Sequence, residues 1–168
     1  MKEAKHRTSN IEHRTPNEMG DGAWILREGG AGGRINLENR LLEFASAVID
    51  LSERLPETRA GNHIAGQILR SGTSPFPNHG EAESAESSED FIRKLKICLK
   101  ELRETRRWAR LIQRKHWTQE DSTLLFVLNE SDELIRIFMA SIRTALQNAL
   151  VQKRRTRATV TYPSGETD

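Results

Sequence analysis

The chain of 168 residues carries a formal net charge of +2 and is poor in aromatic side chains. This length fits a single domain with one core, so we expect no second domain. Tyr occurs once, whereas Leu, Ile, Ala, Glu, Arg and Lys dominate the middle of the chain. The composition argues against a sheet-rich fold and predicts an all-α protein.

Cysteine content and apolar runs bear on cellular location. The one cysteine, Cys98, cannot form a disulfide within the chain, which favours a reducing compartment. The N-terminal segment lacks the apolar core of a signal peptide. No segment approaches the roughly 18 continuous apolar residues of a membrane span. We therefore expect a soluble, cytoplasmic protein that does not engage a membrane.

Residues 1–34 are polar, mixed in charge, and end in a glycine-rich stretch, EGGAGG at 28–33. Glycine loses the most backbone entropy on ordering, so this region is predicted to be a flexible arm. Trp24, Ile25 and Leu26 form a short apolar island in it. Such an island could dock on a partner, although in a tail of this kind it is more often inert.

Three later segments place apolar residues alternately four and three positions apart, which puts one apolar stripe along a helix. The stripes consist of Leu37, Leu41, Phe44, Val48, Leu51 and Leu55; of Phe91, Leu95, Cys98, Leu102, Thr105, Ala109 and Ile112; and of Leu124, Leu128, Ser131, Ile135, Phe138, Ile142, Ala145 and Ala149. This spacing predicts three long helices.

Helix-terminal signals accompany these stripes. Asn36 is a plausible N-cap for the first helix, and Pro56 ends it. Ser87 or Ser88 opens the helix that starts near residue 89, with carboxylates in its first turn. Residues 118–121, TQED, resemble a capping box before the last helix.

A less regular helix is expected from about residue 59 to 69. Pro75 and Pro77 follow it, and either would remove a helical hydrogen bond, so a kink or break is predicted near residues 73–77. A short helical piece over 78–86 comes next. The short connections favour an antiparallel up-and-down four-helix bundle over residues 35–150. Residues 151–168 are predicted to form a flexible basic tail.

The last two helices carry more apolar side chains than one bundle seam needs. We interpret this surplus as the interface of a homo-oligomer, whereas a wide core stripe with a few exposed apolar residues is the alternative. The surplus consists of Ile92, Ile97, Leu99, Trp108, Leu111, Leu125, Val127, Leu134, Ile137, Met139 and Leu146.

Residues 67–113 closely resemble the four-helix-bundle proteins named for the intervening sequences of bacterial 23S ribosomal RNA. The motifs are LRSGTS at 69–74, Asn78 followed by EA at 81–82, AES at 85–87, DFI-x-KL at 90–95 and KELRET at 100–105. The resemblance covers about residues 35–150. Its signature positions, which we expect to be structural, are Arg70, Ser71, Gly72, Asn78, Glu81, Asp90 and Phe91.

The resemblance implies a homo-oligomer, typically a pentamer of antiparallel bundles, with no known enzymatic activity. A protein related to this family, the accessory variability factor of diversity-generating retroelements, is a basic pentamer that binds nucleic acid and a reverse transcriptase. The resemblance therefore suggests RNA or DNA, and a reverse transcriptase or other protein, as partners besides further copies of the chain.

The residues offer no catalytic, metal or cofactor site. Only EAKH at 3–6 has the Glu-x-x-His spacing of a bundle metal site, and it lies in the predicted arm. His63, His79 and His116 fall near helix ends or turns, where we expect solvated or capping roles. Cys98 lies on an apolar seam and is expected in the core.

Small structural roles are expected for the signature residues. Gly72 should permit close approach of two helices. Asn78 and Glu81 should bond Arg70 or the backbone groups freed by the prolines.

Charge is distributed unevenly along the predicted third long segment. Glu81, Glu83, Glu86, Glu89 and Asp90 precede a basic run over 93–115 that contains only two carboxylates, Glu101 and Glu104. The plain alternative is a solvated face with i,i+4 pairs such as Lys100 with Glu104. In an oligomer the repeated patch would attract phosphate. The candidate nucleic-acid-binding residues are Arg106, Arg107, Arg110, Arg114, Lys115, Lys153, Arg154, Arg155 and Arg157.

The sequence thus predicts a non-enzymatic, homo-oligomeric helical scaffold that engages nucleic acid or a nucleic-acid enzyme through a basic surface. The alternative is a protein-only interaction module. A nuclease is the least favoured reading, because clustered carboxylates or histidines are missing.

Overall fold

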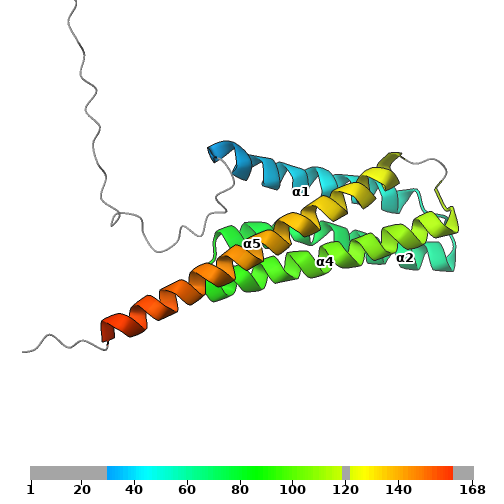
Figure 1. Ribbon diagram of the computed structural model, residues 1–168. Coiled ribbons are helices and arrows are strands. Elements are labelled where there is room, and N and C mark those ends of the chain that lie inside the picture. Colours follow the sequence, from blue (N-terminus) through cyan, green and yellow to red (C-terminus); the bar gives the residue numbers. More distant parts are fainter. Residues whose placement is uncertain (1–29, 119–121, 161–168) are drawn as a thin grey trace, which may run out of the picture.

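The computed structural model describes residues 30–118 and 122–160, and the side chains of 37–118 and 122–155. These ranges contain five helices and no strand (Figure 1). The helices are α1 (Gly30–Glu53), α2 (Arg59–Thr73), α3 (Pro75–Glu83), α4 (Ser88–Lys115) and α5 (Ser122–Val160). Because α2 and α3 follow one another along a single arm, the fold is an antiparallel up-and-down four-helix bundle, and the predicted all-α class is confirmed.

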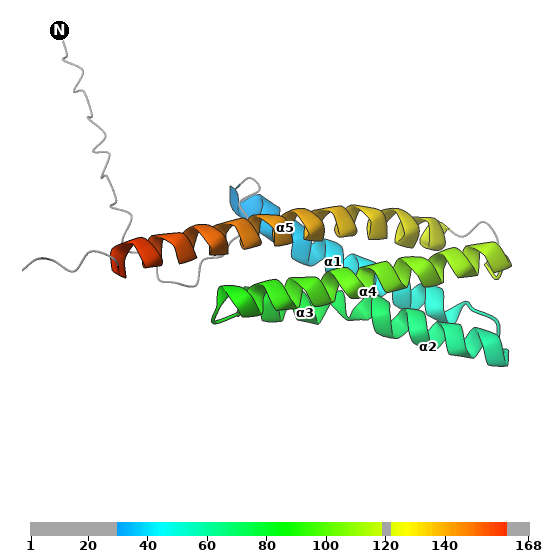
Figure 2. The same ribbon diagram turned by 60° about the horizontal axis from the view of Figure 1, so that its bottom comes forward.

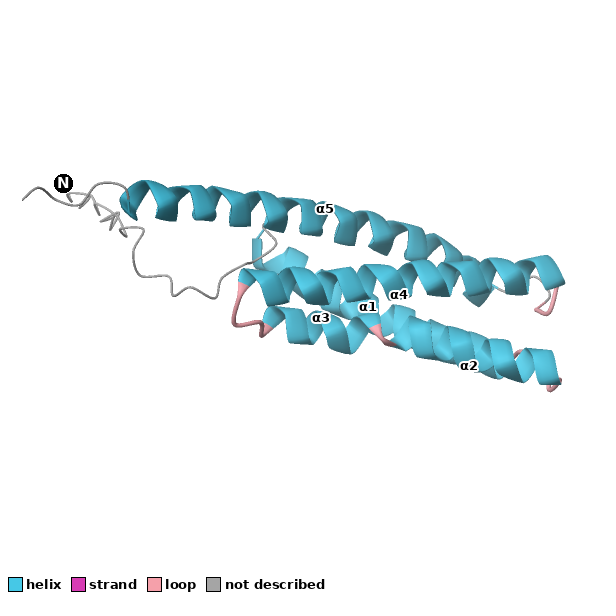
Figure 3. Cartoon of the chain, turned by 90° about the horizontal axis from the view of Figure 1, so that it is seen from below, coloured by secondary structure: helices cyan, strands magenta, loops and turns pink. Residues whose placement is uncertain are grey.

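Each arm of the bundle packs against two neighbours. Helix α1 contacts α2, α3 and α5, and α4 contacts the same three helices, so α1 and α4 occupy opposite corners. Figure 3 shows α4 between α5 and the broken α2–α3 arm. The C-terminal end of α5 extends past the turn between α3 and α4. This arrangement brings the end of α5 to the start of α4.

The core follows the predicted stripes on α1 and α4 but shifts on α5. Val127 and Leu134 are fully buried, whereas Leu128 and Ile135, which the sequence placed on the seam, are half-buried. Ile92 is also buried, at 7% exposure. Three members of the predicted surplus, Ile92, Val127 and Leu134, therefore belong to the core rather than to an outer surface.

Helix α5 also meets a simple test for a membrane span. Its stretch Ser122–Arg155 is long and apolar enough by length and composition alone. The core helix of a bundle passes the same test, and on α5 the side chains of Val127, Leu134 and Phe138 line the bundle core.

Both terminal helices are longer than the sequence indicated. Helix α1 begins at Gly30, inside the predicted arm of residues 1–34 and before the proposed cap Asn36. Helix α5 continues to Val160 and so includes the first ten residues of the predicted tail, 151–160. Once a helix is nucleated, each further residue adds a hydrogen bond, and the Gln, Lys and Arg residues after 151 are good helix formers. Residues 1–29, 119–121 and 161–168 lie outside the described residues.

The predicted break near the prolines is confirmed at Ser74. Pro75 is the first residue of α3 and Pro77 the third, so their missing N–H groups fall in a first turn that has no helical acceptors. For this reason α3 starts at Pro75 rather than at the predicted Asn78, and it ends at Glu83. Ser87 caps α4 by accepting a hydrogen bond from the Asp90 amide, as predicted.

Two glycines allow close approach of chain segments. A Cβ at Gly72 would lie 2.5 Å from Cγ1 of Val48, so glycine permits α2 to pack tightly on α1, as the sequence predicts. A Cβ at Gly61 would lie 1.9 Å from the Pro56 carbonyl oxygen, which allows the tight turn into α2.

Candidate nucleic-acid interface

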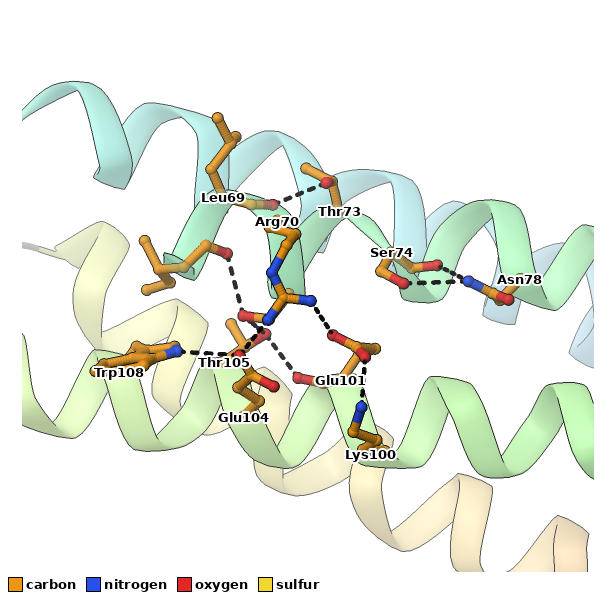
Figure 4. Close-up of polar contacts among 12 residues, drawn as sticks. Leu69, Arg70, Thr73, Ser74, Asn78, Lys100, Glu101, Glu104, Thr105 and Trp108 are labelled. Carbon is orange, nitrogen blue, oxygen red and sulfur yellow. Dashed lines mark hydrogen bonds and ion pairs between the residues drawn. The ribbon is translucent and has the colours of Figure 1, made fainter. Parts of the chain in front are cut away.

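The signature residue Arg70 ties α2 to the inner side of α4 (Figure 4). Its Nη2 lies 2.5 Å from Oε1 of Glu104, and its Nη1 lies 3.6 Å from Oε2 of the buried Glu101. The Trp108 indole N–H donates to the same Glu104 oxygen at 3.4 Å. Glu104 therefore turns toward α2 and does not form the i,i+4 pair with Lys100 that the sequence offered as an alternative.

A buried hydroxyl pair lies beside this ion pair. The Thr105 hydroxyl approaches the Ser71 hydroxyl at 2.9 Å and the Glu101 carbonyl oxygen at 2.9 Å. Ser71 and Thr105 are both fully buried. Because a buried hydroxyl is costly unless it is bonded, these two positions fix the register of α2 against α4.

The remaining signature residues stabilise helix ends and seams. The Asn78 side-chain amide donates to the Ser74 carbonyl oxygen at 2.9 Å, and the Asn78 backbone N–H reaches the same oxygen at 3.3 Å. Asn78 therefore bonds the backbone beside the prolines, but not a group that the prolines freed. Glu81 forms an ion pair with Lys94 and not with Arg70, so that part of the prediction is wrong. Asp90 pairs with Arg93 in the first turn of α4, and Phe91 is buried in the core.

Two histidines differ in their surroundings. His79 is 4% exposed and meets the Phe138 ring edge to face, with centroids 6.1 Å apart. The predicted solvated or capping role is therefore wrong for His79, because α3 begins earlier than expected and turns this side chain inward. His116 ends α4 in the left-handed conformation with φ of 50°, which is a capping role.

Cys98 is an inner residue of α4. Its side chain is buried, and its thiol donates to the Pro75 carbonyl oxygen at 3.5 Å. Burial raises the pKa of the thiol from 9.0 to about 12, which keeps it protonated at neutral pH. Across residues 30–118 and 122–160, no three His, Cys, Asp or Glu side chains gather in a way that would hold a metal ion.

The basic residues predicted to form one surface lie at opposite ends of the bundle. Arg106, Arg107, Arg110, Arg114 and Lys115 occupy the last turns of α4. Lys153 Nζ lies 3.3 Å from Oε1 of Glu89, in the first turn of α4. At 1.5 Å per helical residue, Glu89 and Arg114 are separated by roughly 38 Å.

Antiparallel packing of α4 and α5 causes this separation, so the two groups do not form a common surface within one chain. Arg154 and Arg155 lie on α5 beside Lys153, and the side chain of Arg157 lies outside the described residues.

Among the α4 basic residues of the predicted site, Arg106 forms an ion pair within the chain. Its Nε lies 2.5 Å from Oδ1 of Asp132, and its Nη2 donates to Oδ2 of the same carboxylate at 3.2 Å. Arg106 therefore ties α4 to α5, whereas Arg107, Arg110 and Arg114 are exposed.

An exposed basic stripe runs along the outer face of α4, and we name it the α4 ridge. Its members are spaced by four and three residues, which keeps them on one face of a helix. The stripe rises roughly 27 Å from end to end. The α4 ridge consists of Lys96, Lys100, Arg103, Arg107, Arg110 and Arg114, all of them exposed.

The predicted site included only the last three members of the α4 ridge. Lys96, Lys100 and Arg103 were part of the basic run but not of the site. The signal for them in the sequence is the same four-and-three spacing that marks the core stripes, here followed by basic residues.

The charge of the α4 ridge is largely uncompensated. Among the described residues, Lys96, Arg107, Arg110 and Arg114 form no ion pair. Glu101 lies 3.6 Å from Lys100 but is buried on the inner side. Since Arg70 holds both Glu101 and Glu104 toward α2, the mid-helix carboxylates of α4 are turned away from the ridge. A row of like charges favours binding of an anion.

Comparison with known proteins gives the family. A family model for the 23S rRNA-intervening sequence protein matches residues 35–140. The chain belongs to this family. A solved structure of a protein with unknown function from the S23 ribosomal protein family of Bacteroides thetaiotaomicron is similar as well. It is 36% identical with a TM-score of 0.58, and the alignment covers 63% of this chain and 97% of that chain. A search of curated proteins finds no match.

The residues matched by the 23S rRNA-intervening sequence family model include some of the features described above and leave out others. The seam between Arg70 and Glu104 and the whole α4 ridge fall inside residues 35–140. The last 20 residues of α5, from 141 to Val160, extend beyond the matched region. The α4 ridge thus belongs to the part of the chain that matches the family, whereas Lys153, Arg154 and Arg155 do not.

Proposed function

We propose that this member of the 23S rRNA-intervening sequence family is a non-enzymatic, homo-oligomeric scaffold that binds nucleic acid through the α4 ridge. The observation that carries the proposal is the ridge itself: six exposed basic side chains lie on one helix face, and Arg70 holds the nearest carboxylates, Glu101 and Glu104, toward α2. A nucleic-acid enzyme working on the same nucleic acid, such as a reverse transcriptase, is a compatible protein partner.

The proposed binding is electrostatic. Lysine and arginine contact phosphate oxygens and release counterions, which gives affinity without reading the base sequence. One ridge on one helix offers few contacts, so affinity would come from repetition of the ridge around an assembly. Exposed apolar side chains support an assembly, since ten large ones are at least 38% exposed among the described residues.

The test is fluorescence anisotropy with labelled RNA and DNA duplexes at about 50 mM salt, where phosphate contacts are strong. The variant Arg107→Ala/Arg114→Ala removes two unpaired ridge charges. We expect the Kd to rise by about tenfold or more, which corresponds to about 1.4 kcal/mol.

A matched control removes the same charge elsewhere. Arg93 pairs with Asp90 and Arg136 with Glu133, and both arginines are outside the ridge. The variant Arg93→Ala/Arg136→Ala should bind nearly as tightly as the unaltered protein. If both variants weaken binding equally, the effect comes from the net charge of the protein and not from the ridge. If the unaltered protein binds neither duplex, a protein-only scaffold is the better account.

A further inference from the structure

A second surface, on α5, is left largely uncovered by the described residues 30–118 and 122–160. Its apolar side chains lie on one side of α5 at spacings of three, four and seven residues. Met139 accepts a contact from Arg103 at 3.5 Å, and Asp132 pairs with Arg106, so this side borders the outer edge of α4. We name it the α5 stripe, and it consists of the exposed Leu125, Met139, Leu146 and Leu150 and the half-buried Leu128 and Ile135.

The α5 stripe has basic neighbours. Arg103 lies against Met139, Arg110 follows it two turns later on α4, and the exposed Arg143 lies between Met139 and Leu146 on α5. If two copies met stripe against stripe, these arginines would face one another. Like charges across an interface cost several kcal/mol, so pairing of the stripe with itself is disfavoured.

Helix α1 offers a complementary surface. Leu42 and Ile49 are seven residues apart on its outer side and are 49% and 41% exposed. Four exposed carboxylates surround them, at Glu38, Glu43, Asp50 and Glu53. The nearby Arg40 is taken up by Glu130 of α5 at 2.6 Å. We name this acidic and apolar surface the α1 face.

We propose that the α1 face of one copy docks on the α5 stripe of the next copy. Apolar residues then meet apolar residues, and the carboxylates of α1 meet Arg103, Arg110 and Arg143. The two surfaces are different, so the contact is heterologous and leads to a ring when the rotation between copies closes. Each chain uses both surfaces once, and this pairing rests on the homo-oligomer of the proposed function.

This docking leaves part of the α4 ridge outside the contact. Lys100 and Arg107 lie roughly 40–60° further around α4 from α5 than Arg103 does, because each residue turns the helix by about 100°. The ring would therefore present Lys100 and Arg107 of every copy to phosphate.

Two variants, each with one surface disabled, test the pairing. Leu42→Glu/Ile49→Glu places carboxylates on the α1 face, and Met139→Glu/Leu146→Glu places them on the α5 stripe. All four positions are 41–49% exposed, so the core is untouched. By light scattering, each variant should have the mass of a single chain, and circular dichroism should show unchanged helicity.

Mixing gives the decisive result. An equimolar mixture should form a heterodimer, because the intact α5 stripe of one variant can bind the intact α1 face of the other. The other two surfaces of this heterodimer both carry introduced glutamates, so they repel each other and the assembly stops at two chains. The control Leu111→Glu/Phe126→Glu alters two apolar residues outside both surfaces, 39% and 41% exposed, and should keep the mass of the unaltered protein.

A second variant avoids any question of folding. Asp50 and Glu53 are both exposed, and Asp50→Lys/Glu53→Lys should weaken the assembly at least tenfold at low salt. If the unaltered protein assembles but the α1 variants keep its mass, the docking proposal fails alone. A monomeric unaltered protein would overturn both this proposal and the homo-oligomer of the proposed function.

Discussion

The two sides of α4 differ in how their charges are paired. On the inner side, Glu101 and Glu104 face Arg70, and Ser71 bonds Thr105, so charge and polarity are satisfied across a seam. On the outer side, basic residues follow one another without a carboxylate between them. The formal charge of +2 hides this segregation. One helix thus carries both the contact that fixes its register and the surface proposed to bind a partner.

The largest expected effect concerns Cys98 on the inner side. Its thiol pKa of about 12 leaves roughly a thousandfold less thiolate at pH 8 than a thiol with the ordinary pKa of 9.0. Alkylation by iodoacetamide at pH 8 should be at least about a hundredfold slower in the folded chain than in urea. Mass spectrometry over time measures both rates.

The pH dependence has a definite sign. A thiol pKa raised by folding stabilises the fold fully below pH 9, and this contribution is lost as the pH rises from 9 toward 12. The alanine variant Cys98→Ala should lose that slope in the free energy of unfolding. Equal labelling rates for folded and unfolded chains would contradict the buried position of Cys98.

The next effect concerns the approach of α2 to α1. Gly72→Ala places a methyl group 2.5 Å from Val48 Cγ1, so the free energy of unfolding should fall by about 1–3 kcal/mol. Adding Val48→Ala to Gly72→Ala removes the methyl groups that cause the clash, so the double variant should regain part of the lost stability. A double-mutant cycle in urea would detect this as a non-additive free energy. Additive losses would show that the two residues are not in contact.

The smallest effect compares one arginine from each side of α4. Arg70→Ala removes the cation nearest to the buried Glu101, but the Arg70 side chain is 57% exposed. After allowance for solvent screening, we expect a loss of about 1 kcal/mol. Arg107→Ala on the ridge should change stability by less than about 0.5 kcal/mol. Urea denaturation of both variants gives the two free energies of unfolding. A larger loss of stability for Arg107→Ala than for Arg70→Ala would contradict the structural role given to the inner side of α4.

Local patterns in the sequence were sufficient for much of the fold. Apolar spacing located α1, α4 and α5, Ser87 marked the start of α4, and Pro75 and Pro77 marked the break. The pattern did not decide which band of α5 faces inward, because Val127 and Leu134 lie only about 100° from Leu128 and Ile135. Both bands are apolar, and the choice depends on packing against α1 and α4.

The candidate site was harder to predict, because it depends on contacts between distant segments. The partners of Arg106 and Lys153 are 26 and 64 residues away in the sequence. Glu81 met Lys94 instead of Arg70 because α3 packs beside the first half of α4. In an antiparallel bundle the C-terminal end of α5 lies beside the acidic start of α4, as the contact between Lys153 and Glu89 shows. The predicted basic surface joined two groups that this topology separates.

The salt dependence of nucleic-acid binding tests the central claim most directly. For the unaltered protein and for Arg107→Ala/Arg114→Ala, the logarithm of the association constant for duplex DNA is plotted against the logarithm of salt concentration. If each arginine contacts one phosphate, the slope of the variant should be flatter by about 1.8, while helicity stays the same. An unchanged slope would contradict phosphate binding by the α4 ridge.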